Sequence, residues 1–208
     1  MKTIKWVIGI ILCSFSLCAD TLYESINDLP FDPAGYFATE QSLDKIFLSQ
    51  EIKTVIELGS WAGASTRFFA RRVGEDGMVY AIDHWLGATN HHGETTAPIR
   101  DHIYHLFLSN IRQAGVEDWV VPMRMTTDEA AKALRKDIRA DLIYVDTSRD
   151  TYRVYTDIKT WHPFLNEDGV MCGTEWREPA VRVGVQKAAA ELDKTIESDR
   201  KGYFWVLR

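Results

Sequence analysis

Residues 54–65 read Thr-Val-Ile-Glu-Leu-Gly-Ser-Trp-Ala-Gly-Ala-Ser, and this stretch decides the fold of the chain. Its β-branched start predicts a buried strand, and Gly59 and Gly63 predict a tight turn before a helix that begins at Ser65. Glu57 lies two residues before the first glycine, where it favours a cationic or hydroxyl-rich ligand and would repel a diphosphate. The stretch therefore predicts a nucleoside-type cofactor without a pyrophosphate, a description that S-adenosylmethionine fits.

Strand-like and helix-like segments alternate along the rest of the chain. Apolar and β-branched runs predict strands over residues 53–58, 78–82, 119–125, 142–145, 170–174 and 203–207. Apolar residues at helical spacing predict helices between the strands, the last of them over residues 181–196. This alternation predicts a single α/β domain over residues 36–208, with a doubly wound, Rossmann-like, mostly parallel sheet that helices cover on both faces. Since only one strand follows the last helix, we expect the sheet to be one strand short at the C-terminus, leaving an exposed edge or a homo-oligomer contact.

Acidic residues stand at the predicted carboxyl ends of four strands. In an open sheet of this kind, crossovers are right-handed and ligands bind at the carboxyl ends of the strands. The acids are Glu57, Asp83, Asp146 and Glu175. Their shared position predicts a binding site along one edge of the sheet.

The composition places the chain among globular proteins. It has 208 residues, of which 46% are hydrophobic, and this is enough for one domain with a sizeable core. The formal net charge is -6 and the basic residues are scattered, which argues against a nucleic-acid partner, because such a partner needs a basic face. Cys172 is the only cysteine outside the N-terminal segment, so no internal disulfide is expected.

The N-terminus has the layout of a secretory signal peptide. Lys2 and Lys5 precede an apolar run over residues 6–17, and small residues follow it. The run is shorter than the roughly 20 apolar residues of a membrane span. We therefore expect residues 1–19 to be a signal peptide, with a short uncleaved anchor as the alternative, and residues 20–35 to be an extended lead-in. The domain is then expected to be exported, either to a periplasm or out of the cell.

The order and spacing of four segments carry a family resemblance: residues 57–65, 79–85, 141–146 and 169–176. Together they resemble the class I S-adenosylmethionine-dependent methyltransferases. Within this class they are most similar to the small O-methyltransferase branch that includes macrocin-type and rhamnosyl-type O-methyltransferases. The resemblance covers residues 36–208, and it implies a Rossmann-like methyltransferase fold and a small-molecule acceptor.

The resemblance also implies which residues hold S-adenosylmethionine. Glu57 and the backbone of residues 59–63 would hold its amino-acid end, and Asp83 would accept both ribose hydroxyls, since two carboxylate oxygens match a vicinal diol. His84 or Trp85 would lie against the adenine, and Thr127 and Asp128 would border it. The full set of candidate contacts comprises Glu57, Gly59, Ser60, Trp61, Gly63, Asp83, His84, Trp85, Thr127 and Asp128. Simpler roles stay open: the glycines can serve strand–helix packing, Trp85 can belong to the core, and Thr127 and Asp128 can cap a helix.

Catalysis is predicted beside Asp146 and Glu175. In the metal-dependent part of the family, acids at these positions bind a divalent cation such as magnesium, which prefers oxygen ligands. Thr174 stands where a further acid is common, so one anionic ligand is missing. Arg149 stands where relatives often carry a histidine base, and arginine cannot be deprotonated in a protein. We therefore hypothesise that Arg149 neutralises Asp146 and Glu175 in place of a metal ion.

Five of the six histidines lie close together in the sequence: His84, His91, His92, His102 and His105. One of them could replace the missing base, or several could form a metal site, although no tight ligand motif such as His-Glu-x-x-His is present. The simplest interpretation is a polar loop over residues 84–98 with surface histidines. Long loops of this kind often shape a binding pocket.

Two functions of different classes follow from these observations. The first is methyl transfer from S-adenosylmethionine to an oxygen atom of a small molecule. The second is that of a cofactor-binding pseudoenzyme or secreted binding protein that has lost metal-dependent chemistry, which Arg149, Thr174 and the export signal favour. A nicotinamide oxidoreductase is disfavoured because the motif Gly-x-Gly-x-x-Gly is absent after the first strand.

Overall fold

A seven-stranded sheet forms the centre of the molecule. The structure is a computed structural model that describes residues 22–31, 37–86 and 97–208, so the predicted signal peptide lies outside the described residues. The strands follow the order β3-β2-β1-β4-β5-β7-β6. They are β1 (Thr54–Leu58), β2 (Met78–Asp83), β3 (Val120–Arg124), β4 (Ala140–Val145), β5 (Leu165–Thr174), β6 (Ile196–Ser198) and β7 (Phe204–Leu207). The first five are parallel to one another, which confirms the predicted α/β class with a mostly parallel sheet.

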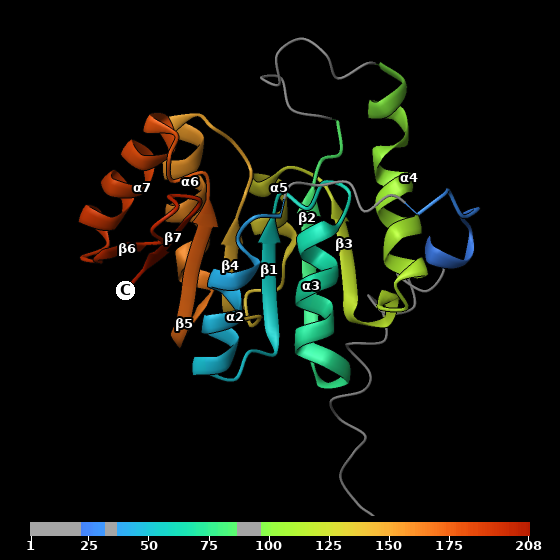
Figure 1. Cartoon of the computed structure of the whole chain (residues 1–208), viewed down its shortest axis with the longest axis horizontal. Helices are drawn as coiled ribbons and strands as arrows, with labels where there is room; N and C mark the ends of the chain where they lie inside the picture. Colours follow the sequence, from blue (N-terminus) through green and yellow to red (C-terminus); the bar gives the residue numbers. More distant parts are fainter. Residues whose placement is uncertain (1–21, 32–36, 87–96) are drawn as a thin grey trace, which may run out of the picture.

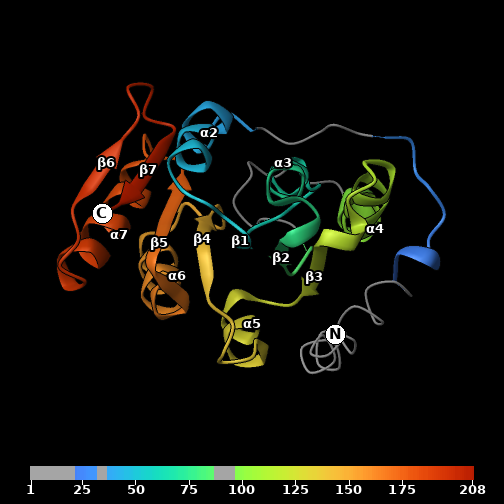
Figure 2. The ribbon, with the colours of Figure 1, turned by 90° about the horizontal axis from the view of Figure 1, so that it is seen from below.

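Helices cover both faces of the sheet, as Figure 1 and Figure 2 show. On one face lie α2 (Glu40–Ser49), α3 (Ala64–Val73) and α4 (Ala97–Gln113), and on the other lie α5 (Thr127–Ala133), α6 (Thr151–Trp161) and α7 (Pro179–Glu191). Each layer buries its own apolar cluster against the sheet, the first with Leu43, Phe69 and Phe107, the second with Ile158 and Val185. The doubly wound arrangement is therefore confirmed. Among the helices in the described part of the chain, none combines the length and the apolar character needed to cross a membrane.

The sheet is not one strand short, and the prediction on this point was wrong. Two strands follow α7: β7 pairs antiparallel with β5, and β6 pairs antiparallel with β7. The helical spacing of Leu192 and Ile196 extended the predicted last helix, whereas α7 ends at Glu191. Asp193 has a left-handed backbone (φ 53°), which interrupts the helix and leaves Ile196 free to enter the edge strand. With three residues, β6 is too short to show an alternating pattern.

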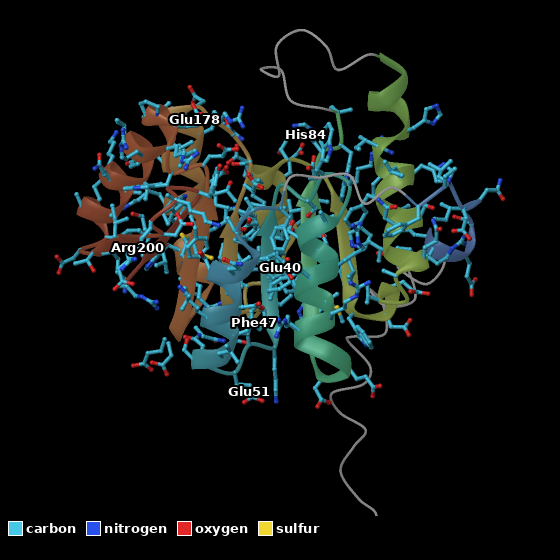
Figure 3. All side chains as sticks on the ribbon, in the orientation of Figure 1. Glu40, Phe47, Glu51, His84, Glu178 and Arg200 are labelled. Atoms are coloured by element: carbon cyan, nitrogen blue, oxygen red, sulfur yellow. The ribbon has the colours of Figure 1, made fainter. Side chains whose placement is uncertain are left out.

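The carboxyl ends of the parallel strands lie at one edge of the sheet. Asp83 closes β2, Asp146 follows β4 and Glu175 follows β5. Because β2, β1, β4 and β5 are neighbours in the sheet, these acids and Glu57 of β1 are spread along a single edge. Figure 3 shows His84, the residue that follows β2, at this edge. The edge is therefore the place to look for a ligand site.

The described part of the lead-in packs along α4. Residues 22–24 form a helical turn, and the chain is irregular from there to Phe31. The guanidinium of Arg112 donates to the carboxylate of Asp28 at 2.7 Å. The backbone N–H of Leu29 donates to the hydroxyl of Ser109 at 2.9 Å. These bonds hold the segment before the domain against the same helix that follows the loop after β2.

Candidate functional site

The turn after β1 is built on glycine and lies against the loop after β4. Gly59 (φ 91°) and Gly63 (φ 83°) have left-handed backbones, which only glycine adopts without strain. A Cβ atom on Gly59 would lie 2.1 Å from the carbonyl oxygen of Asp146, so the two loops touch backbone to backbone. The predicted strand–turn–helix order is confirmed, with α3 beginning at Ala64.

Glu57 ties the end of β1 to the start of α3. It is fully buried, and its two carboxylate oxygens accept hydrogen bonds from the hydroxyls of Ser65 and Thr66. Burial raises the pKa of Glu57 to about 7, against the opposing effect of these hydrogen bonds. The buried carboxylate therefore fixes the start of α3 relative to β1. Its role as an acceptor for a cofactor ammonium stays a prediction.

Ser60 gives the turn an unpaired polar group. Its hydroxyl is buried and has no hydrogen-bond partner among the residues that the structure describes, although it lies close enough to Glu57 to lower the pKa of that carboxyl. Buried polar groups in proteins nearly always have a partner. The hydroxyl of Ser60 therefore lies beside Glu57 inside the glycine turn without a well-aligned bond to it, and a ligand at the turn can supply a further partner.

The carboxylate of Asp83 accepts backbone hydrogen bonds from two loops, one after β1 and one after β2, each of which contains a tryptophan. The backbone N–H of Trp61 donates to Oδ2 at 3.0 Å, and that of Trp85 donates to Oδ1 at 2.7 Å. Both tryptophans have left-handed backbones, with φ of 44° and 51°. Each carboxylate oxygen keeps a further lone pair, and the side chain is 13% exposed. Asp83 can therefore hold both loops and still accept a vicinal diol.

His84 and Trp85 have opposite environments, although they are neighbours in the sequence. The indole of Trp85 is fully buried and packs against the rings of Tyr104 and Phe107, with centroids 4.6 Å and 4.8 Å away. Its N–H donates to the carbonyl oxygen of Trp61 at 2.7 Å. His84 is exposed. Of these two predicted adenine neighbours, the structure leaves His84 accessible and places Trp85 in the core.

Thr127 and Asp128 begin α5, and both are engaged by α6. Thr126 is the N-cap and forms a capping box with the third residue of the helix. The hydroxyl of Thr127 donates to Oδ1 of Asp157 at 2.6 Å, and Asp128 forms an ion pair with Arg153 at 3.1 Å. The side chains of both predicted cofactor neighbours are therefore bound to the protein, and a contact with the cofactor stays a prediction.

Asp146, Arg149, Thr174 and Glu175 meet at the ends of β4 and β5. The hydroxyl of Thr174 donates to Oδ1 of Asp146 at 2.5 Å, and Nη2 of Arg149 donates to Oε1 of Glu175 at 2.7 Å. Burial raises the pKa of Asp146 to about 6, with the charge of Glu175 adding to the increase, while the bond from Thr174 and the charge of Arg149 oppose it. The arginine thus pairs directly with one predicted acid and acts on the other through its charge.

These residues do not fit a divalent cation. The hydroxyl of Thr174 donates a hydrogen bond to Asp146, and the guanidinium of Arg149 already pairs with the carboxylate of Glu175. Within residues 22–31, 37–86 and 97–208, no group of three or more histidine, cysteine, aspartate or glutamate side chains is arranged to hold a metal ion. A hard cation would need several free oxygen ligands at this point. The guanidinium of Arg149 occupies Glu175, so that carboxylate is not free to bind a cation.

The predicted histidine group is only partly described. His91 and His92 lie outside the described residues. On α4, Nε2 of His105 lies 2.6 Å from the carbonyl oxygen of Asn27, and His102 lines a groove between α4 and the lead-in. The two described histidines of α4 therefore belong to the contact with the lead-in.

Backbone strain gathers at the carboxyl edge of the sheet. Among the described residues, four that are not glycine have a positive φ, and three of them follow β1, β2 and β5: Trp61, Trp85 and Glu175. Such conformations cost about 1–3 kcal/mol each and cluster at functional sites. Strain, the orphan hydroxyl of Ser60 and two carboxyls with raised pKa values thus coincide at one edge.

Three contributors to this site were missed from the sequence: Ser65, Thr66 and Asp157. Ser65 and Thr66 tie the end of β1 to the start of α3, and Asp157 ties α6 to the start of α5 and to the loop after β4. Small hydroxyl residues near a helix start are common, and a single acid on an amphipathic helix has no spacing signature. The position of Ser65 and Thr66 in the first turn after a glycine turn is the one signal that could have found them.

Comparisons with known proteins give the family and the fold of the chain. Residues 56–175 match the family model described as "Methyltransferase domain". The fold is similar to that of a candidate O-methyltransferase from Klebsiella pneumoniae, with a TM-score of 0.63 at 18% identity, over 97% of this chain and 91% of that chain. It is also similar to an O-methyltransferase from Bacillus cereus in complex with SAH, with a TM-score of 0.62 at 16% identity, over 93% of this chain and 90% of that chain. A third similar structure is the O-methyltransferase TomG from Streptomyces achromogenes in complex with SAM, with a TM-score of 0.61 at 16% identity, over 93% of this chain and 87% of that chain. No curated protein matches the chain.

Proposed function

This chain belongs to the methyltransferase domain family, and from that premise we propose that it transfers the methyl group of S-adenosylmethionine to an oxygen atom of a small molecule. The observation that carries the proposal is Asp83, whose carboxylate orders two loops and keeps lone pairs for a diol at the carboxyl edge. The complexes of similar O-methyltransferases with SAH and SAM support the choice of cofactor. Within the family we propose the branch of macrocin-type and rhamnosyl-type enzymes, because residues 57–65, 79–85, 141–146 and 169–176 together resemble it.

The residues at the carboxyl edge match the parts of S-adenosylmethionine. Asp83 would bind the ribose hydroxyls, and the glycine turn at residues 59–63 would face the amino-acid end, where the unpaired hydroxyl of Ser60 gains a partner. His84 is exposed beside Asp83 and would lie on the adenine side. When bound, the cofactor supplies a methyl group on a sulfonium that an oxygen nucleophile can attack.

Asp146 is the residue that we assign as the base. A general base works best with a pKa near the working pH, and burial raises the pKa of Asp146 to about 6. In the transfer, the O–H bond of the acceptor would break and its proton would go to the Asp146 carboxylate. The acceptor oxygen would form a bond to the methyl carbon while the methyl–sulfur bond breaks, and the electron pair of that bond would stay on sulfur. The charge of Arg149 keeps Asp146 ionised more than burial alone would, so Arg149 takes the place that a metal ion would hold.

Cofactor binding without methyl transfer is the second candidate function. One observation favours it: the Arg149–Glu175 ion pair and the hydrogen bond from Thr174 to Asp146 occupy the acids that would otherwise act on an acceptor. Turnover separates the two candidates. A panel of hydroxylated small molecules incubated with labelled S-adenosylmethionine would yield a labelled product only in the first case.

Calorimetric titration with S-adenosylmethionine and S-adenosylhomocysteine tests the cofactor site. We expect binding by the wild-type chain and its loss in Asp83→Ala. Asp76→Ala is the matched control, because Asp76 is an exposed aspartate in the turn that precedes β2, at the opposite end of the same strand. Failure of the wild-type chain to bind either compound would exclude both candidate functions.

We also propose that the domain is exported, because residues 1–19 have the layout of a signal peptide. The test is mass spectrometry of the protein expressed with a C-terminal tag in a secreting bacterium. A product that lacks the first residues and lies outside the cytoplasm is expected. A full-length product in the cytoplasm would contradict export.

A further inference from the structure

Asp157 joins two loops of the site that the sheet leaves apart. In the sheet β3 and β4 are separated by β2 and β1, so the loops after them do not meet through strand pairing. Asp157 lies on α6 and is 1% exposed. Its Oδ1 accepts from the hydroxyl of Thr127, just after β3, at 2.6 Å, and its Oδ2 accepts from the hydroxyl of Thr147, just after β4, at 2.7 Å. Thr127 is the first residue of α5, so one buried carboxylate joins the start of that helix, where the loop after β3 ends, to the loop after β4.

A second contact strengthens this connection. Arg153 lies one helical turn before Asp157 on α6 and forms an ion pair with Asp128 at 3.1 Å. Residues four apart on a helix lie on the same face, so α6 holds two consecutive residues of α5, Thr127 and Asp128, from one side. Both oxygens of the Asp157 carboxylate have donors, which is the condition under which a carboxylate is tolerated at such depth.

We propose that Asp157 is a positioning residue that sets the separation between the loop of Thr127 and the loop of Thr147. The first loop borders the predicted adenine side of the cofactor, and the second begins directly after the base Asp146. The hydroxyl of Thr127 donates its hydrogen bond to Asp157. Thr127 would therefore border a cofactor through the position of its backbone. This inference rests on the proposed function, because it assigns the two loops to the cofactor and to the base.

Substitution by leucine tests the proposal. Asp157→Leu keeps the branching of the side chain and leaves the buried hydroxyl of Thr127 and the half-buried hydroxyl of Thr147 without their acceptor. The dissociation constant of S-adenosylhomocysteine should therefore rise about tenfold or more. Asp157→Asn can accept from one hydroxyl and donate to the other, because a threonine hydroxyl serves in both roles. It should restore binding to within about threefold of the wild-type value. Recovery of binding by this conservative variant would show that the hydrogen bonds to the two threonine hydroxyls, and not the negative charge of Asp157, position the loops.

Tyr144→Phe is the matched control for loss of a buried hydroxyl bond. Its hydroxyl bonds that of Thr39 at 2.7 Å, and Tyr144 belongs to the apolar cluster on the opposite face of the sheet from α6. We expect the variant to lower the melting temperature and to leave the dissociation constant unchanged. The comparison separates a general loss of stability from a change in the position of the two loops.

Each result of these titrations decides the inference. If Asp157→Leu folds and binds S-adenosylhomocysteine as the wild-type chain does, the positioning role is overturned. If it does not fold, Thr147→Val carries the test, since it removes one donor only: a dissociation constant raised about threefold or more supports the proposal, and an unchanged one overturns it. No binding by the wild-type chain would overturn the proposed function and this inference together, whereas binding that no variant changes overturns the inference alone.

Discussion

Replacing Glu57 by glutamine should remove a pH dependence from the stability of the fold. Glu57 is fully buried, and burial raises its pKa from 4.5 to about 7. A carboxyl whose pKa is raised by folding binds more protons in the native state than in the unfolded state between these two pH values. The free energy of unfolding therefore falls as the pH rises through this window. An increase from 4.5 to about 7 corresponds to about 3 kcal/mol.

The assay is urea unfolding followed by tryptophan fluorescence, from below pH 4.5 to above pH 7, on the wild-type chain and on Glu57→Gln. The difference between the two isolates Glu57, because other titrating groups are common to both proteins. Glutamine keeps the size of the side chain and can pair with the hydroxyls of Ser65 and Thr66, so the variant should gain about 3 kcal/mol relative to the wild type across the window. Glu167→Gln, at an exposed position, should show a constant difference. A constant difference for Glu57→Gln would refute the reasoning.

Four other outcomes follow from the structure. Gly59→Ala should lower the melting temperature far more than Gly115→Ala. Both positions have a left-handed backbone, which costs alanine about 1–2 kcal/mol, but only at Gly59 does the new Cβ meet a carbonyl oxygen at 2.1 Å. Equal effects of the two substitutions would contradict the backbone contact. Magnesium titration by calorimetry should show no stoichiometric binding, and clear binding that vanishes in Asp146→Ala would contradict the role of Arg149. Arg149→Gln should also shift the acid limb of a methyl-transfer pH profile upward, because loss of a positive charge raises the pKa of Asp146. The thiol of Cys172 is fully buried with a raised pKa, so it should react with a thiol reagent only after denaturation, and rapid reaction of the native protein would contradict its burial.

The elements that could be predicted are those with strong local signals. The β-branched run of residues 54–56 favours a strand, and Gly59 and Gly63 favour a tight turn because glycine tolerates a left-handed backbone. The structure has both. The C-terminal region shows where such signals end. Leu192 and Ile196 have helical spacing, yet the backbone turns at Asp193 and β6 pairs with β7. That pairing depends on a strand further along the chain, which local periodicity does not report.

Within the site, the sequence could predict residue types at strand ends but not their partners. Asp83 and Asp146 stand at the edge where alternation and parallel pairing predicted them. Trp85 was a candidate for contact with the cofactor, and packing against α4 places it in the core. Asp157 had no signal at all, because its role depends on where α6 lies relative to two loops. The direction in which a side chain points from a loop is set by the layer that packs on it, which the residue itself does not encode.

By itself, the sequence determined the α/β class, the glycine turn at residues 59–63 and the acids at the carboxyl edge, because backbone preference and periodicity act between neighbouring residues. Only the tertiary structure decided what those acids do. Glu57 pairs with the first turn of α3, and Glu175 pairs with Arg149. The structure also adds an acid that the sequence did not mark, Asp157 of α6, which joins the start of α5 to the loop after β4. The last two are contacts between segments distant in the chain, and the burial that raises the pKa of a carboxyl exists only when the layers pack.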